Sequence, residues 1–240
     1  KVSPFTVLSM PNFNSKDHLK VATNWSEQIK IKPLSKVSTP IKNKLTIGYL
    51  SADFRNHPLY YLIFDILKSH NKKMFNIKLF YSGPDETSSE HEEFKKLDCQ
   101  FFNISNESDD KGAQLIRDEK VDILVDLSGF TQNSRSFIAA YKPARYHINW
   151  LGFAGTMGFH HEKPLFDFIL SDKYIIPDGK INDYAEKVLY LPHCYQPNIA
   201  DRPKLTSKTK RDYGFNDHTF IYASFSQPIK ITKDQFNIWI

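Results

Sequence analysis

The feature that most constrains the fold is an alternation of short apolar segments with amphipathic ones, which starts at residue 44. Residues 45–51 are β-branched and aromatic, which is typical of a buried strand, and residues 58–70 carry apolar side chains at helical spacing. Pro58 stands at a favourable first helical position. Such alternation favours a parallel sheet with right-handed crossovers. The sequence therefore predicts an α/β fold built on a Rossmann-like parallel sheet.

The same pattern continues along the chain and predicts further elements in sequence order. Strands are expected over 76–81, 100–104, 121–127, 146–151, 167–171 and 187–191, and helices over 90–97, 111–119 and 134–141. Three of the connecting loops, residues 52–57, 128–133 and 152–158, carry polar or glycine residues directly after a strand. Because an open parallel sheet places ligand-binding groups in the loops after its strands, these three loops predict a site at one edge.

Five side chains near strand ends are candidates for chemistry, and each also has a structural interpretation. His57 can exchange a proton near pH ~6.5, or it can cap the following helix, and Asp53 is better suited to capping backbone donors. Thr131 and Thr156 are candidate hydroxyl donors, although loop threonines also cap helices. Lys230 follows a predicted strand end, where a cation can stabilise a leaving group or simply face solvent. The residues alone leave these alternatives open.

The remaining parts of the chain predict a division into three segments. Residues 1–43 are expected to form an N-terminal helical adaptor and linker, with helices over 5–10 and 16–31, and residues 44–206 the main Rossmann-like domain. Residues 207–240 are expected to begin a second Rossmann-like domain.

That last segment predicts a strand over 219–225 and a helix that Thr232 caps. The chain starts at Lys1 and stops at Ile240 inside this predicted helix. We therefore expect it to be a piece of a longer protein.

Composition and absent motifs exclude several classes of protein. The net charge of +5 is scattered rather than gathered in a stripe, so nucleic-acid binding is not expected. The two cysteines lie far apart, which disfavours a disulfide framework and fits a reducing, cytoplasmic location. No apolar run approaches the ~20 residues that span a membrane. Dinucleotide, P-loop, H-E-x-x-H and G-x-S-x-G motifs are missing, so neither a metal-dependent enzyme nor an α/β-hydrolase is expected.

Six motifs, in order, resemble the catalytic region of the O-GlcNAc transferase and SPINDLY family. They are IGYLSADFRNHP (47–58), VDILVDLSGFT (121–131), KPAR (142–145), WLGFAGTMG (150–158), LPHCYQP (191–197) and FSQPIKIT (225–232). The likeness runs from about residue 45 to the end and corresponds to the N-terminal half of that region. The helices before residue 40 are similar to the segment that joins the family's tetratricopeptide repeats to its catalytic half.

The resemblance implies an inverting glycosyltransferase of the GT-B type that uses neither a metal nor another cofactor. In this family two Rossmann-like domains hold a nucleotide sugar between them, and a protein Ser or Thr hydroxyl is the acceptor. The expected donor is UDP-GlcNAc, and tetratricopeptide repeats are expected upstream in the parent chain. Two alternatives stay open: a GDP-fucose protein O-fucosyltransferase of the SPINDLY kind, and a non-catalytic protein-binding module.

The resemblance also carries roles over to matching positions. His57 matches a histidine beside the sugar that has been proposed as the base, and Lys230 matches a lysine beside the diphosphate. The positions that match donor-binding residues are Thr131, Leu151, Gly152, Thr156 and Gln227. Phe130 replaces the usual His or Tyr, and Ala154 replaces the usual Pro. The family's uridine-binding residues lie further along, so this piece is expected to hold half a cleft and to be inactive alone.

Overall fold

The computed structural model describes residues 3–38, 40, 43–200 and 206–240. Contacts divide the chain into two compact units, Lys1–Ile199 and Ala200–Ile240, which are described separately below. The predicted boundaries at 43/44 and 206/207 stay predictions, because compactness alone does not test them. None of the described helices is both long enough and apolar enough to span a bilayer.

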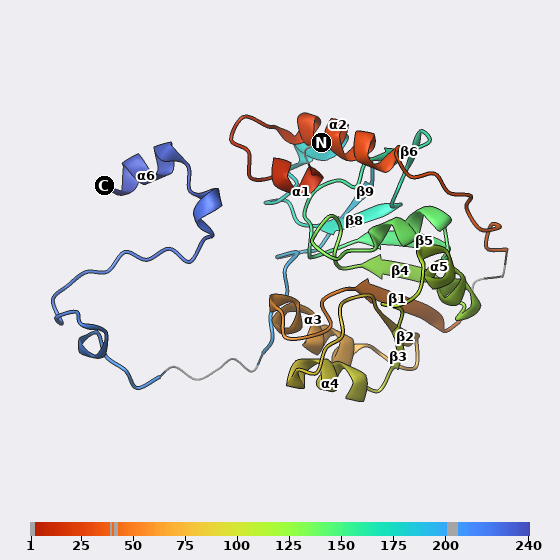
Figure 1. The fold of residues 1–240 in the computed structure, drawn as a ribbon, viewed down its shortest axis with the longest axis horizontal. Helices are drawn as coiled ribbons and strands as arrows, with labels where there is room; N and C mark the ends of the chain where they lie inside the picture. Colours follow the sequence, from red (N-terminus) through yellow and green to blue (C-terminus); the bar gives the residue numbers. More distant parts are fainter. Residues whose placement is uncertain (1–2, 39, 41–42, 201–205) are drawn as a thin grey trace. The chain divides into compact units, whose positions relative to one another are not determined.

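A seven-stranded parallel sheet forms the centre of the first unit (Figure 1). The strands are β1 Leu45–Ser51, β2 Phe75–Tyr81, β3 Gln100–Asn103, β4 Ile123–Asp126, β5 Tyr146–Asn149, β8 Phe168–Ser171 and β9 Lys187–Tyr190, in the spatial order β3-β2-β1-β4-β5-β8-β9. All neighbouring pairs in this sheet are parallel. This confirms the predicted α/β class. A hairpin that the sequence did not predict, β6 Phe159–His160 with β7 Lys163–Pro164, is antiparallel.

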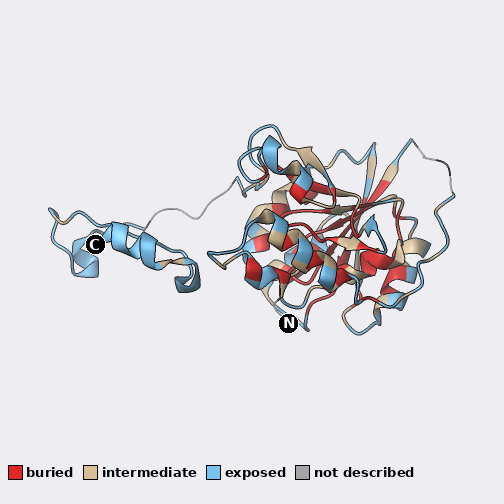
Figure 2. Cartoon of the chain, turned by 90° about the horizontal axis from the view of Figure 1, so that it is seen from above, coloured by how far each residue is buried: buried red, intermediate tan, exposed pale blue. Residues whose placement is uncertain are grey.

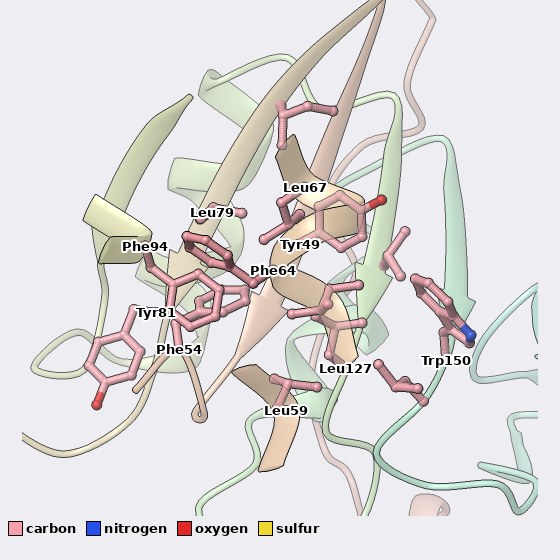
Figure 3. Packing of buried hydrophobic residues seen from close by; sticks show 14 of the residues in the cluster. Tyr49, Phe54, Leu59, Phe64, Leu67, Leu79, Tyr81, Phe94, Leu127 and Trp150 are labelled. Carbon is pink, nitrogen blue, oxygen red and sulfur yellow. The ribbon is translucent and has the colours of Figure 1, made fainter. Parts of the chain in front are cut away.

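Helices cover both faces of the sheet because the strands alternate their apolar side chains. Tyr49 of β1 lies in one buried cluster with α3 (Pro58–Ser69) and α4 (Ser89–Lys96), whereas its neighbour Leu50 lies in a second cluster with α5 (Asp109–Asp118). Figure 3 shows the first cluster, in which apolar residues of α3 pack against the strands.

The helix predicted over 134–141 is a 3₁₀ helix, η1 (Ser136–Tyr141). It ends at Lys142, which adopts a left-handed conformation with φ 52°. A second 3₁₀ helix, η2 (Asp178–Asp183), precedes β9. The helix η1 packs against α5, and its Ile138 lies in the second cluster, so this short helix also helps to cover that face of the sheet.

The N-terminal helices α1 (Pro4–Val7) and α2 (Ser15–Ser26) pack onto the rest of the first unit, as predicted. The Ser26 hydroxyl is buried and donates to Met157 O at 2.7 Å. Ile29 belongs to a third buried cluster with Phe153 and Met157. Helix α2 therefore supports the loop that follows β5.

The second unit differs from its prediction, because none of its described residues lies in a strand. Residues 219–225 have no partner strand among the described residues of this unit, and Phe225 is fully exposed. Figure 2 shows this unit mostly in the colour of exposed residues. The helical elements are η3 Arg211–Tyr213, η4 Pro228–Lys230 and α6 Lys233–Trp239. The predicted cap is confirmed: Thr232 Oγ1 accepts from Gln235 N at 3.2 Å. A local cap needs only its own helix, whereas a strand needs a partner.

Candidate functional site

The three predicted loops meet at the carboxyl ends of β1, β4 and β5, which are adjacent in the sheet. The Ser51 hydroxyl and Ala52 N both lie 3.4 Å from Ser128 Oγ, which joins the first loop to the second. Gly152 of the third loop lies so close to the second that a Cβ there would be 2.1 Å from Leu127 O. The three loops therefore lie close enough together to form one site.

His57 is the N-cap of α3 and is held there by a hydrogen bond to the backbone. Its Nδ1 accepts from Leu59 N at 3.2 Å, and its side chain is 38% exposed. Burial lowers the pKa of His57, and Arg55 adds to this, although Asp53 acts in the opposite direction. The neutral ring that accepts at Nδ1 carries its proton on Nε2. In this arrangement Nε2 can act only as a hydrogen-bond donor, and accepting a proton there requires the other tautomer and loss of the cap.

Asp53 does not cap backbone donors as predicted, because its carboxylate contacts a side chain instead. Oδ1 lies 3.1 Å from Arg55 Nη2, and Oδ2 lies 3.9 Å from His57 Nδ1. Arg55 also donates from Nε to Ala52 O at 3.3 Å. The prediction was wrong because the guanidinium two residues away reaches back across the turn. This ion pair holds the loop that presents His57.

Thr131 lies in the second loop, and its hydroxyl donates a hydrogen bond within that loop. Thr131 Oγ1 donates to Ser128 O at 2.8 Å, and its backbone N donates to the same oxygen at 3.2 Å. The side chain is half-buried. Toward a ligand, the hydroxyl can therefore only accept a hydrogen bond, because the predicted donor role would break the contact with Ser128.

Leu151 and Gly152 form a tight turn directly after β5. Gly152 N donates to Trp150 O at 3.0 Å, and Leu151 has φ 77°, a strained conformation for a branched residue. The Leu151 side chain is buried in the first cluster, so it does not face a ligand. Gly152 is exposed, and the turn therefore offers backbone groups to a ligand. Strain of this kind often marks functional sites.

Thr156 is not available to a ligand, which corrects its predicted donor-binding role. Its side chain is completely buried and donates to Glu186 Oε2 at 2.6 Å. Thr156 Oγ1 itself accepts from Gly158 N and from Ala185 N, each at 3.1 Å. Every hydrogen-bonding position of this hydroxyl is therefore used within the fold. The role of Thr156 is to hold the third loop in place.

Glu186, which the sequence analysis missed, is the partner of this loop. Its Oε1 accepts from Met157 N at 2.6 Å, and the residue is buried. Glu186 precedes β9 by one residue and lies 30 positions from Thr156 in the sequence. No local sequence motif therefore indicates the contact. The only signal is an acidic residue immediately before an apolar segment.

Glu186 is expected to make folding stability fall as the pH rises. Burial raises the pKa of Glu186 from 4.5 to about 7, so the folded state binds this proton more tightly than the unfolded state. The resulting stabilisation is complete below about pH 4.5 and is lost as the pH rises through about 7. Between pH 5 and pH 8, the unfolding free energy of the wild type should fall by roughly 3 kcal/mol relative to Glu186→Gln. Urea denaturation at both pH values measures this difference.

The exposed Glu162 supplies the matched control for this prediction, as Glu162→Gln removes one carboxyl at the surface. Its difference from the wild type should stay constant between the two pH values. An equal pH dependence in wild type and Glu186→Gln would contradict the role given to Glu186.

The structure describes Gln227 and Lys230 within the second unit. Lys230 N donates to Gln227 O at 2.9 Å, and both side chains are exposed. Their predicted contact with a nucleotide sugar stays a prediction, because the two units are described separately.

A hollow of about 730 Å³ opens at the opposite edge of the sheet, near the start of β1, β2 and β3. Lys44, Lys78 and Gln100 are among its lining residues. Because this hollow lies away from the three loops, its volume is not a guide to the candidate site. In the described part of the chain, no three or more His, Cys, Asp or Glu side chains are grouped so as to hold a metal ion.

Comparisons with known proteins agree with the six motifs. The model described as Glycosyl transferase family 41 matches residues 26–205. A probable UDP-N-acetylglucosamine–peptide N-acetylglucosaminyltransferase SEC from Arabidopsis thaliana is 31% identical over 202 residues, which are 82% of this chain and 20% of that protein. A probable enzyme of the same activity named SPINDLY, from Oryza sativa subsp. japonica, is 29% identical over 202 residues, covering 81% and 21%.

A solved structure shares the fold. A mutant O-GlcNAc transferase from Thermobaculum terrenum superposes with a TM-score of 0.75 at 22% identity, over 86% of this chain and 40% of that one. The chain thus spans about a fifth of the length of the two plant relatives. Because the family model covers well over half of its residues, the chain belongs to glycosyltransferase family 41.

Proposed function

We propose that the parent of this chain is an inverting, metal-independent transferase that moves N-acetylglucosamine from UDP to Ser or Thr hydroxyls of proteins. The observation that carries the proposal is the meeting of the loops after β1, β4 and β5 at one edge of the sheet in a member of this family. The names of the plant relatives describe transfer of this sugar to peptides, which supports the same donor and acceptor.

In this proposal the first unit binds the sugar through groups that the loops present. Nε2 of His57 donates a hydrogen bond to an oxygen of the donor, because Nδ1 is occupied by Leu59 N. The exposed backbone at Gly152 allows the sugar to approach closely, and the Thr131 hydroxyl accepts a hydrogen bond. The base role first predicted for His57 is the alternative, and it requires loss of the α3 cap.

The second unit contributes charge in this proposal. The acceptor hydroxyl releases its proton to solvent, and its oxygen forms a bond to the anomeric carbon while the bond from that carbon to the diphosphate breaks. Negative charge therefore grows on the leaving diphosphate, and the ammonium of Lys230 stabilises it. Gln227 is the second donor-binding residue of this unit. The 240-residue chain alone is expected to be inactive.

Transfer assays with the full-length parent test the proposal. Lys230→Ala should lower kcat by about 100-fold or more, the usual cost of removing one group that stabilises developing charge. Lys233→Ala, an exposed lysine in α6, is the matched control and should keep wild-type activity. Unchanged transfer in Lys230→Ala, with folding preserved, would favour a non-catalytic binding module.

The donor is tested by offering the parent UDP-GlcNAc and GDP-fucose in parallel. Turnover with UDP-GlcNAc is expected, and turnover with GDP-fucose alone would favour a protein O-fucosyltransferase instead. His57→Ala should reduce transfer, while His161→Ala, which alters an exposed histidine, should not. A loss of activity below the ordinary histidine pKa in wild type, absent in His57→Ala, would support a base role over hydrogen-bond donation.

A further inference from the structure

Strands β4 and β5 both end in a buried polar side chain. Asp126 is the last residue of β4 and Asn149 the last residue of β5, and the two are partners in the parallel register. Both are completely buried. Since partners in register point to the same face of a sheet, these two side chains are neighbours in the interior.

Each side chain holds one of the loops of the candidate site. Asp126 Oδ1 accepts from Ser128 N at 2.9 Å and from Gly129 N at 2.6 Å. Asn149 Nδ2 donates to Phe153 O at 3.2 Å and to Gly155 O at 3.1 Å. The two residues are therefore positioning residues for the loops 128–133 and 152–158.

The remaining oxygen of each side chain has no hydrogen-bond partner among the described residues. These atoms are Asp126 Oδ2 and Asn149 Oδ1, both buried. Rotating the Asn149 amide would not help, since its oxygen would then face the carbonyls of Phe153 and Gly155. The nearby Ser136 hydroxyl already donates its single proton to Gly129 O at 2.7 Å. Two neighbouring acceptors thus lack a donor, and one added proton satisfies both.

We propose that Asp126 is a protonated carboxylic acid in the folded protein and that its Oδ2–H donates to Asn149 Oδ1. The proton comes from solvent and stays on the carboxyl when the chain folds. One hydrogen bond then connects the two loops through the strands that carry them. This inference rests on the proposed function only where it identifies these loops as the sugar-binding site.

The surroundings of Asp126 favour the neutral acid. Burial raises the pKa of Asp126 to about 6, against the opposing effect of the backbone hydrogen bonds from Gly129 and Ser128 and of the nearby Ser136 hydroxyl, and no charged side chain of the described residues contributes. A hydrogen bond from the neutral form to Asn149 raises the pKa further. The proposal requires this bond to keep the carboxyl protonated at pH 7.

Asp172, which follows β8, provides an internal contrast. It is also buried, but both of its oxygens are occupied: Oδ1 accepts from Tyr174 N and Ile175 N, and Oδ2 accepts from Tyr195 N. The backbone hydrogen bond from Tyr195 is the largest of the effects that lower the pKa of Asp172. An ionised carboxylate suits this site, and an amide does not, because an amide has only one acceptor oxygen.

The pair of substitutions Asp126→Asn and Asp172→Asn tests the proposal in the 240-residue chain. In Asp126→Asn, the amide oxygen replaces Oδ1 and its NH₂ donates to Asn149, so the thermal midpoint should match the wild type. Asp172→Asn should lower the midpoint. Asp126→Ala should lower the midpoint and speed amide hydrogen exchange in both loops. A midpoint in Asp126→Asn as low as in Asp126→Ala would overturn the proposal.

Carbon-13 NMR of the Asp carboxyls reads the protonation state directly. The Asp126 signal is identified because it disappears in Asp126→Asn. In the wild type at pH 7, it should have the chemical shift of a neutral acid. An ionised carboxylate at that pH, bridged to Asn149 by water for example, would overturn the proposal. None of these measurements depends on sugar transfer, so they stand or fall separately from the proposed function.

Discussion

Phe54→Ala is expected to lower the unfolding free energy of the first unit by about 3–5 kcal/mol. Phe54 is completely buried, and its ring lies 5.0 Å from that of Phe94 and 6.5 Å from that of Phe101, measured between centroids. Figure 3 shows Phe54 beside Phe94 within the cluster under α3. Removing the ring leaves a cavity that the strands cannot close. Urea denaturation followed by circular dichroism measures the change.

Phe220→Ala is the control, because Phe220 in the second unit is 76% exposed and should change stability by less than about 0.5 kcal/mol. A destabilisation by Phe54→Ala of less than about 1 kcal/mol would contradict the packing described here.

Phe54→Ala should also affect the candidate site, because Phe54 lies between Asp53 and Arg55 in the loop that leads to His57. A looser loop lets water reach the imidazole, so the pKa of His57 should rise toward its ordinary value of 6.5. Phe64→Ala, in α3 of the same cluster, destabilises the core without altering that loop. NMR titration of His57 should therefore separate the two variants, and equal shifts in both would argue against the role of Phe54.

Gly152→Ala is expected to separate the second and third loops of the candidate site. The new Cβ would lie 2.1 Å from Leu127 O and 3.2 Å from Ser128 Cα, both of which are backbone atoms. Because strand β4 cannot move away, the turn after β5 must shift. We expect this shift to lower the unfolding free energy by about 1–3 kcal/mol. A shift of about 1 Å in a reacting group can cost about 100-fold in rate. Transfer by the full-length parent should fall by at least that factor.

Gly179→Ala is the matched control, since nothing lies within 4 Å of a Cβ at that glycine. It should leave both stability and transfer close to wild type. Wild-type transfer by Gly152→Ala would contradict the need for close contact between the second and third loops.

Much of the fold could be predicted because strands and helices depend on local periodicity. The apolar segment predicted over 45–51 is β1, and the alternation that follows it predicted the parallel sheet. Element ends moved by a few residues, as for β5, which ends at Asn149 rather than at 151. The loop positions followed from the strand positions, so their meeting at one edge was predictable too.

The roles of individual side chains were less predictable, because they depend on partners that are distant in sequence. Thr156 was predicted to donate to a ligand, yet its hydroxyl donates to Glu186 instead. His57 was predicted at the right place, but only the bond to Leu59 N decides which ring nitrogen carries its proton. Nothing near these residues in the sequence specifies those contacts.

By itself, the sequence determined the α/β class, the order along the chain of the strands in the main sheet and the three loops, because side-chain periodicity is a local property. Only the tertiary structure decided which polar groups are occupied and which face outward. Strand register placed Asp126 beside Asn149, and the packing of α2 and Glu186 around residues 152–158 buried Thr156. Such pairings form only when distant segments are brought together, so hydrogen-bond partners follow from the fold rather than from any one stretch of residues.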